Sequence, residues 1–175
     1  KGKAKGKGKG KTATVTGVSD YLLLVSLREI IQAHAVKAEL SFESHFASVL
    51  PVITPFIAST EMGERQVAAE CMGMMTFLNP AMMAPELEKI CNEGAVDLDK
   101  KISTGSSEPE VTEDGPPLSA REINLRWSLA TMLKFSISRD LSGENRSAVF
   151  DSVVKYLPAL LQDDNVDVRK AAIIL

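Results

Sequence analysis

The stretch ERQVAAECMGMMTFL, Glu64 to Leu78, decides how the rest of this sequence is interpreted. Its larger apolar side chains recur at helical spacing along one face: Val67, Cys71, Met74, Met75 and Leu78. The small residues Ala68, Ala69 and Gly73 would let another helix approach closely. The glycine costs about 1 kcal/mol relative to alanine in a helix. The stretch therefore predicts a helix that is covered on more than one side.

An arginine at the head of an apolar, alanine-containing run occurs three times, at Arg65, Arg126 and Arg169. The last two arginines are 43 residues apart, and the first two are 61 residues apart with a polar, proline-rich stretch between them. Without that stretch the interval falls to about 40 residues, inside the range of two-helix repeats. Leu-Pro followed by apolar residues precedes the first and third arginine helices. We therefore expect an all-α fold of stacked antiparallel helix pairs, each a helix A followed by a helix B.

Prolines and capping residues predict further helix ends. Proline residues 51 and 55 should kink or split the predicted helix A at 41–59. Helix starts are predicted at Asp20, at Asn79 with Pro80 in the first position, and at Ser119, where Glu122 completes a capping box. A last helix A is predicted at 148–162, followed by an Asp-rich turn. The methionines between 72 and 83 could line a binding groove, but adaptable core packing is the favoured interpretation.

Composition argues for an ordinary soluble protein. The 175 residues are 45% hydrophobic and 25% charged, and no run of 18 apolar residues could span a membrane. Cys71 and Cys91 lie in predicted helices without a C-x-x-C spacing, which argues against zinc and a disulfide framework and fits a reducing compartment. We expect both cysteines in the core, structural roles for His34 and His45, and a cytoplasmic or nuclear location.

The first 19 residues form a segment of their own. Lysine occupies every odd position from 1 to 11 and no aromatic residue is present, so we expect disorder. Six of the 20 basic residues lie here, and the remaining 14 face 23 acidic residues, which leaves the rest of the chain at about −9. Nucleic-acid contact through this arm is one alternative, and a solvated extension is favoured. The Gly-Lys-Thr at 10–12 lacks the first glycine of a phosphate-binding loop, because residue 5 is lysine.

Residues 95–117 lose all helical periodicity and gather Ser, Gly, Pro and acidic residues. We expect a disordered acidic loop inside a folded unit that spans 20–175. The loop has no D-x-[DN]-x-[DN]-G pattern, so no calcium site is predicted. The sequence also begins without Met and stops in an apolar run, which we interpret as a fragment of a longer array.

The phrase YLPALLQDDNVDVRKAAIIL, which starts at Tyr156, resembles a HEAT repeat: Leu-Pro in helix A, an Asp-rich turn, then Val-Arg and alanines in helix B. The ordered phrases YLLLVSLREII, RQVAAECMGMMTFLNP, KFSIS and DDNVDVRKAA also resemble the C-terminal part of the cullin-associated neddylation-dissociated family. The resemblance covers about 21–94 and 119–175. The lysine-rich arm and the acidic loop depart from the family pattern.

This resemblance implies a HEAT-repeat α-solenoid without catalytic activity. It implies a regulator that binds cullin-RING ubiquitin ligases lacking neddylation and promotes exchange of their substrate receptors. The implied partner is a cullin with its RING subunit, and no cofactor, metal, membrane or small-molecule substrate is expected. A generic HEAT scaffold, of the nuclear transport receptor or phosphatase scaffold type, is the alternative.

Candidate contact residues are the hydrophilic ends of the B helices, namely Glu64, Arg65, Arg121 and Arg126. Simple solvation, or pairing between repeats, is the competing interpretation for these four side chains. The residues offer no nucleophile with a base, no paired carboxylates on rigid elements and no metal set, so an enzyme is not expected.

Overall fold

The computed structural model describes residues 17–36, 43–99, 117–137 and 146–173, and these form helices and turns without any β-strand. The elements are α1 (Gly17–Val36), η1 (Glu43–His45), α2 (Phe46–Ile53), η2 (Thr54–Ala58), α3 (Met62–Leu78), α4 (Pro80–Glu93), α5 (Ala120–Ile137), α6 (Arg146–Leu161) and α7 (Val166–Ile173). The all-α prediction is confirmed for these residues.

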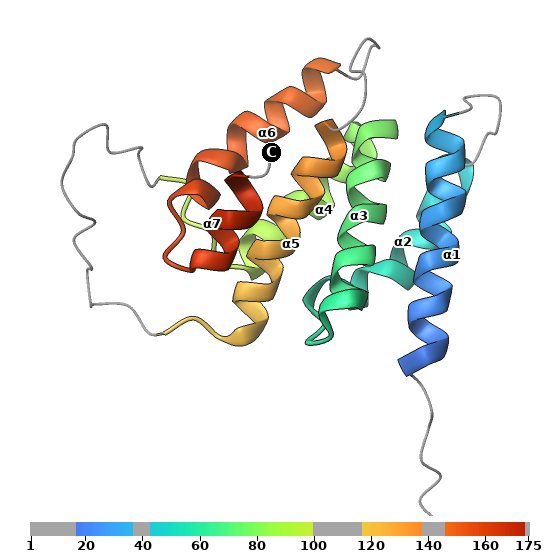
Figure 1. The fold of residues 1–175 in the computed structure, drawn as a ribbon. Helices are drawn as coiled ribbons and strands as arrows, with labels where there is room; N and C mark the ends of the chain where they lie inside the picture. The colour runs from blue at the N-terminus through green and yellow to red at the C-terminus, as the bar shows by residue number, and fades with distance from the viewer. Residues whose placement is uncertain (1–16, 37–42, 100–116, 138–145, 174–175) are drawn as a thin grey trace, which may run out of the picture.

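The helices form two layers (Figure 1). One layer is the row α1, α3, α5 and α7, in which each helix packs against the next. The other layer contains the α2–η2 segment, α4 and α6, which pack against the first row. The three arginine-headed segments predicted as B helices are α3, α5 and α7, and they are consecutive neighbours in the first layer. Each of them also packs against the A segment that precedes it, α3 against η2, α5 against α4 and α7 against α6, as the predicted pairs of helices A and B require.

Helix α3 lies between α1 and α5, and nearly its whole circumference is covered. Met72, Met75 and Cys71 are fully buried, in agreement with the core interpretation of the methionines. Gly73 lies directly against α5: a Cβ atom placed there would be 2.5 Å from the carbonyl oxygen of Met132 and 2.6 Å from the Cβ of Phe135. The predicted close approach of a second helix to the small residues of α3 is thus observed.

The prolines break the second layer as expected. Pro51 lies inside α2, and Pro55 is the second residue of the 3-10 segment η2 that continues it. Because proline lacks an N–H, the carbonyls of Ala47 and Pro51 lose their α-helical donors. The carbonyl of Leu50 accepts from the backbone N–H of Thr54 and also from its hydroxyl, the latter at 2.8 Å.

Two predicted caps are confirmed. Asn79 accepts a hydrogen bond from the backbone N–H of Met82 at 3.1 Å. The hydroxyl of Ser119 accepts from the N–H of Glu122 at 3.2 Å, and the Glu122 carboxylate accepts from the N–H of Ser119 at 2.6 Å. This reciprocal pair is a capping box. The hydrogen bonds that the Ser119 hydroxyl and the Ser119 N–H donate to the carboxylate lower the pKa of Glu122.

The predicted start at Asp20 is wrong, because α1 begins at Gly17. Asp20 instead lies in the first turn, where a carboxylate also interacts favourably with the helix dipole. The rest of the predicted disordered arm, residues 1–16, and most of the predicted acidic loop, residues 100–116, lie outside the described residues. None of the described helices combines the length and the apolar character that a membrane span requires.

Candidate functional site

Arg65 is the first of the predicted contact residues, and its guanidinium points into the molecule. The side chain is buried, and its Nη1 donates to the carbonyl of Ser59 at 2.6 Å. The guanidinium carbon lies 5.1 Å from the centre of the Trp127 ring on α5, a cation–π contact between neighbouring helices. Burial lowers the pKa of Arg65. This arginine therefore stabilises the turn before α3 and the α3–α5 contact.

Arg126 joins three segments of the chain. Its Nε donates to the carbonyl of Gly94 at 2.6 Å, its Nη2 donates to the carbonyl of Ala95, and its Nη1 donates to the Asp163 carboxylate at 2.9 Å. Arg126 and Asp163 are both buried. The guanidinium thus connects the end of α4, the helix α5 and the turn before α7.

The third arginine of the repeat, Arg169, behaves in the same way. Its Nη1 donates to the carbonyl of Asp164 at 3.0 Å and to that of Asp163. All three arginine-headed helices therefore use the guanidinium to satisfy carbonyls of a preceding turn. For Arg65 and Arg126, pairing inside the array is the interpretation that this geometry supports.

Arg121 and Glu64 are placed differently. The Arg121 side chain is 64% exposed and forms an ion pair of 3.0 Å with Glu93 at the end of α4. Glu64 is partly buried and accepts a hydrogen bond from the Ser59 hydroxyl at 2.8 Å. Of the four predicted contact residues, Arg121 is the most exposed, while Arg65 and Arg126 are buried. Contact with a partner stays a prediction for all four residues.

A polar contact that the sequence did not reveal connects α1 with α3. Arg28 donates to the Glu70 carboxylate at 3.2 Å, and Gln66 donates to the same carboxylate at 2.9 Å. Glu70 is buried in spite of its charge. The hydrogen bond of Arg28 to Glu29, together with that to Glu70, raises the pKa of Arg28 against its partial desolvation.

The carbonyls at the end of η2 are satisfied by the next B helix. Ser128 donates to the carbonyl of Ile57 at 2.6 Å, and Asn124 donates to that of Ser59 at 3.2 Å. Both donors belong to α5 and neither was singled out from the sequence. Their spacing of four residues, which places both on one face of the predicted helix, was the sequence signal that could have identified them as a pair.

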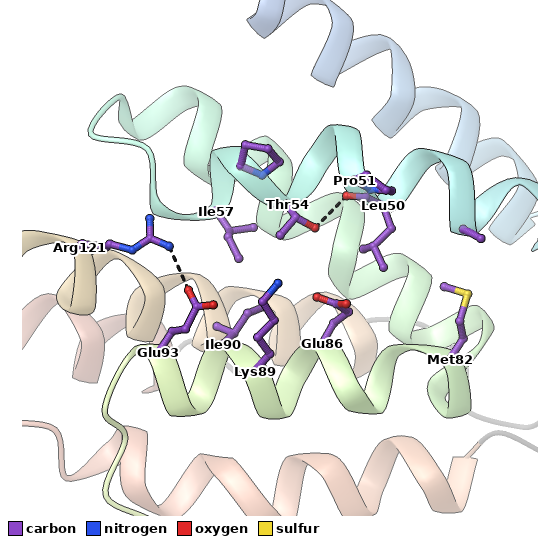
Figure 2. Close-up of a pocket in the computed structure, with 12 residues that line it drawn as sticks. Leu50, Pro51, Thr54, Ile57, Met82, Glu86, Lys89, Ile90, Glu93 and Arg121 are labelled. Atoms are coloured by element: carbon purple, nitrogen blue, oxygen red, sulfur yellow. Dashed lines mark hydrogen bonds and ion pairs between the residues drawn. The ribbon is translucent and has the colours of Figure 1, made fainter.

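A groove lies between the α2–η2 segment and α4, with a volume of about 610 Å³ (Figure 2). One wall includes Leu50, Thr54 and Ile57, and the other includes Met82, Glu86, Lys89 and Ile90. The Arg121–Glu93 ion pair lies at one end. No local sequence pattern predicts this groove, although the two prolines that bend its first wall predict the bend.

The remaining chemistry-bearing residues occupy structural positions. Cys71 and Cys91 are buried, and desolvation raises the pKa of both thiols, that of Cys71 to about 12. His34 is buried with its ring edge-on to Phe46, 6.5 Å between centroids. Within the described ranges, no group of three or more His, Cys, Asp or Glu residues could hold a metal ion.

Comparison with known proteins gives distant but extended similarity. The chain is 25% identical over 152 residues to the Cullin-associated NEDD8-dissociated protein 1 of Drosophila melanogaster, which covers 82% of this chain. It is 26% identical over 159 residues to the protein of that name from Dictyostelium discoideum, which covers 88% of this chain. The Arabidopsis thaliana protein of that name is 34% identical over 68 residues, or 39% of this chain.

The chain spans about a tenth of the length of these relatives, between 6% and 11%. No family model matches the chain, and no solved structure matches it. The two longer matches cover most of the sequence, as the ordered phrases predicted. The resemblance of this chain to the cullin-associated NEDD8-dissociated proteins is therefore confirmed.

Proposed function

We propose that this chain is part of a non-catalytic regulator that binds cullin-RING ubiquitin ligases lacking neddylation and promotes exchange of their substrate receptors. The observation that carries the proposal is the similarity, over 82% and 88% of the chain, to two proteins named for association with cullins. A cullin with its RING subunit is the proposed partner, in the cytoplasm or nucleus.

The architecture suits a binding role of this kind. Helices α1, α3, α5 and α7 lie side by side, and the exposed residues of this layer are spread along the row, mainly on α1 and α7 and at the heads of α3 and α5. Repeat arrays use such surfaces to hold long partners through many weak contacts. Exposed polar side chains on this layer include Glu29 on α1 and Gln66 on α3. Arg121 at the head of α5 adds an exposed positive charge.

A non-catalytic role agrees with the state of the most nucleophilic side chains. Thiolates, not thiols, are the reactive form of cysteine. Burial raises the pKa of Cys71 to about 12 and also raises that of Cys91, so both thiols stay protonated at neutral pH. His34, which could act as a base elsewhere, packs against Phe46.

A pull-down with both forms of the partner tests the proposal. The immobilised chain is incubated with a purified cullin–RING complex, either unmodified or carrying NEDD8. We expect recovery of the unmodified complex and loss of recovery after modification. If the chain recovers neither form, or both forms equally, the proposal is wrong.

The Arg121→Glu variant refines the test, because Arg121 is the exposed member of the predicted contact set. Reduced recovery of the unmodified complex would support contact at the head of α5. Arg146→Glu is the control, since Arg146 is an exposed arginine on α6, in the other layer.

A further inference from the structure

Exposed apolar side chains gather at the two ends of the helix row. Eleven large apolar side chains are exposed in the described part of the chain, and eight of them lie on α1, α6 and α7. These eight are between 41% and 69% exposed, whereas α4 and α5 carry none of the eleven. Figure 1 shows α1 at one end of the row and the pair α6–α7 at the other. The exposed apolar surface therefore belongs to the helices with a neighbour on only one side.

On α1 the exposed apolar side chains share one face. Leu22, Leu23 and Ile30 lie within about a third of the helix circumference at 3.6 residues per turn. Leu24 and Ile31 lie on the opposite face and are fully buried. Among the described elements, α1 packs mainly against α3. The outer face of α1 is thus apolar and turned away from the core.

The last helix pair carries the corresponding surface at the other end. Val166 and Ile173 are seven residues apart on α7, so they share one face, while Val168 on the opposite face is fully buried. Phe150 and Val154 are four residues apart on α6 and add a second apolar strip to this pair.

The two end faces are the opposite halves of the contact that repeats along the row. Within the chain, α3 and α5 each have a neighbour on both sides, and Met62 is their only exposed large apolar side chain among the described residues. One more step of the row would place a helix against the outer side of α7, and one step in the other direction would place a helix against α1. Soluble repeat arrays end in units with a polar outer face, which α1 and α7 do not have.

We propose that these end faces bind each other in a second copy of this chain, so that copies associate head to tail with α7 of one copy against α1 of the next. The chain carries both halves of the contact, and a second copy continues the row with the packing already used between α1, α3, α5 and α7. Such an interface is heterologous, so each copy keeps one free end and association continues beyond a dimer.

Sedimentation velocity of the full chain from about 1 to 100 µM tests this proposal. We expect the mean mass to rise with concentration beyond that of a dimer. Ile30→Glu and Val166→Glu each place a charge in one half of the contact, and each should weaken association at least about tenfold. Val52→Glu is the control, because Val52 is an exposed apolar residue on α2, away from both ends, and association should not change. Circular dichroism checks that all three variants are folded.

A mixture of the two end variants tests the head-to-tail arrangement. The Ile30→Glu chain keeps its α7 face, and the Val166→Glu chain keeps its α1 face. Each variant alone should therefore be monomeric where the original chain is associated. Their equimolar mixture should form dimers and nothing larger, because only one intact contact can form between them.

Three results would overturn the proposal. One is a chain that stays monomeric over the whole concentration range, which would mean that something other than a second copy covers the end faces. The second is an equal loss of association in Val52→Glu, which would reveal nonspecific apolar aggregation. The third is a mixture of folded end variants that does not associate, or association that only one of the two end variants abolishes. None of these results depends on whether the chain binds a cullin.

Discussion

The substitution Gly73→Ala should destabilise this protein, although alanine is the better helix former. Alanine in a helix interior normally gains about 1 kcal/mol over glycine. Here the added Cβ would lie 2.5 Å from the Met132 carbonyl oxygen, 2.6 Å from the Phe135 Cβ and 3.1 Å from the Met132 Cα. Two of these atoms are backbone and the third is fixed to it, so no side chain can rotate away. Helices α3 and α5 must separate.

The magnitude follows from two opposing terms. Forcing extra atoms into a packed core costs about 1 to 3 kcal/mol. Because two of the contacts would lie below 3.0 Å, the upper part of this range applies, about 2 to 3 kcal/mol. After the gain of about 1 kcal/mol in helix propensity, we expect a net loss of about 1 to 2 kcal/mol in the free energy of unfolding, and a fall in Tm of about 2 to 8 °C. The assay is urea unfolding followed by circular dichroism and by fluorescence of Trp127, the one tryptophan of the sequence.

Gly63 supplies the matched control on the same helix. A Cβ at this exposed position would meet only the Tyr21 ring, at 3.4 Å and beyond. Gly63→Ala should therefore leave stability unchanged or raise it by up to about 1 kcal/mol. If Gly73→Ala proved as stable as the unchanged chain, or gained as much as Gly63→Ala, the close α3–α5 contact would be refuted.

Three further perturbations give distinct outcomes. Arg126→Met should lower the free energy of unfolding by about 3 to 5 kcal/mol, because it leaves the buried Asp163 carboxylate without its ion-pair partner. Adding Asp163→Asn should recover part of this loss in a double-mutant cycle. Additive losses would contradict the pairing. Between about pH 9 and 12 the folded protein holds a proton on Cys71 that the unfolded chain releases, so the free energy of unfolding should fall as pH rises through this window. The variant Cys71→Ala should flatten this dependence on pH. An unchanged slope in that variant would argue against burial of the thiol. Ser119→Ala should cost about 1 kcal/mol by removing the capping box, and no change in the urea midpoint would count against it.

Helix positions follow from the sequence where local signals are strong. Asn79 and Ser119 carry side chains that satisfy free N–H groups, and both cap the helices they were expected to cap. The predicted B helix at 64–78 begins two residues earlier, at Met62, and the last predicted helix A at 148–162 lies at 146–161. Such shifts are normal, because terminal turns depend on weak interactions.

The orientation and burial of the charged side chains were harder to predict. The arginine at the head of a B helix was considered for partner contact or for pairing between repeats, because sequence spacing does not show which way a long side chain turns. Arg65 and Arg126 turn inward because carbonyls at the ends of other helices need donors. Glu70 is buried because Arg28, 42 residues away, lies beside it across a helix contact. Such long-range pairs depend on tertiary packing.

The groove depends on packing in the same way. Prolines 51 and 55 predicted a bend, and the bend is present. The space that the bend leaves beside α4 depends on how two A helices sit relative to each other, which no local pattern encodes. Met82 shows the limit of prediction from local sequence. It belongs to the methionine cluster expected mainly in the core, yet it lines the groove, whereas its neighbour Met83 is fully buried.

Calorimetric titration of this chain with unmodified and NEDD8-modified cullin–RING complex tests the central claim most directly. The proposed function predicts an affinity for the unmodified complex at least about tenfold higher than for the modified one, a difference of about 1.4 kcal/mol. Equal affinities, or no measurable heat with either form, would contradict it.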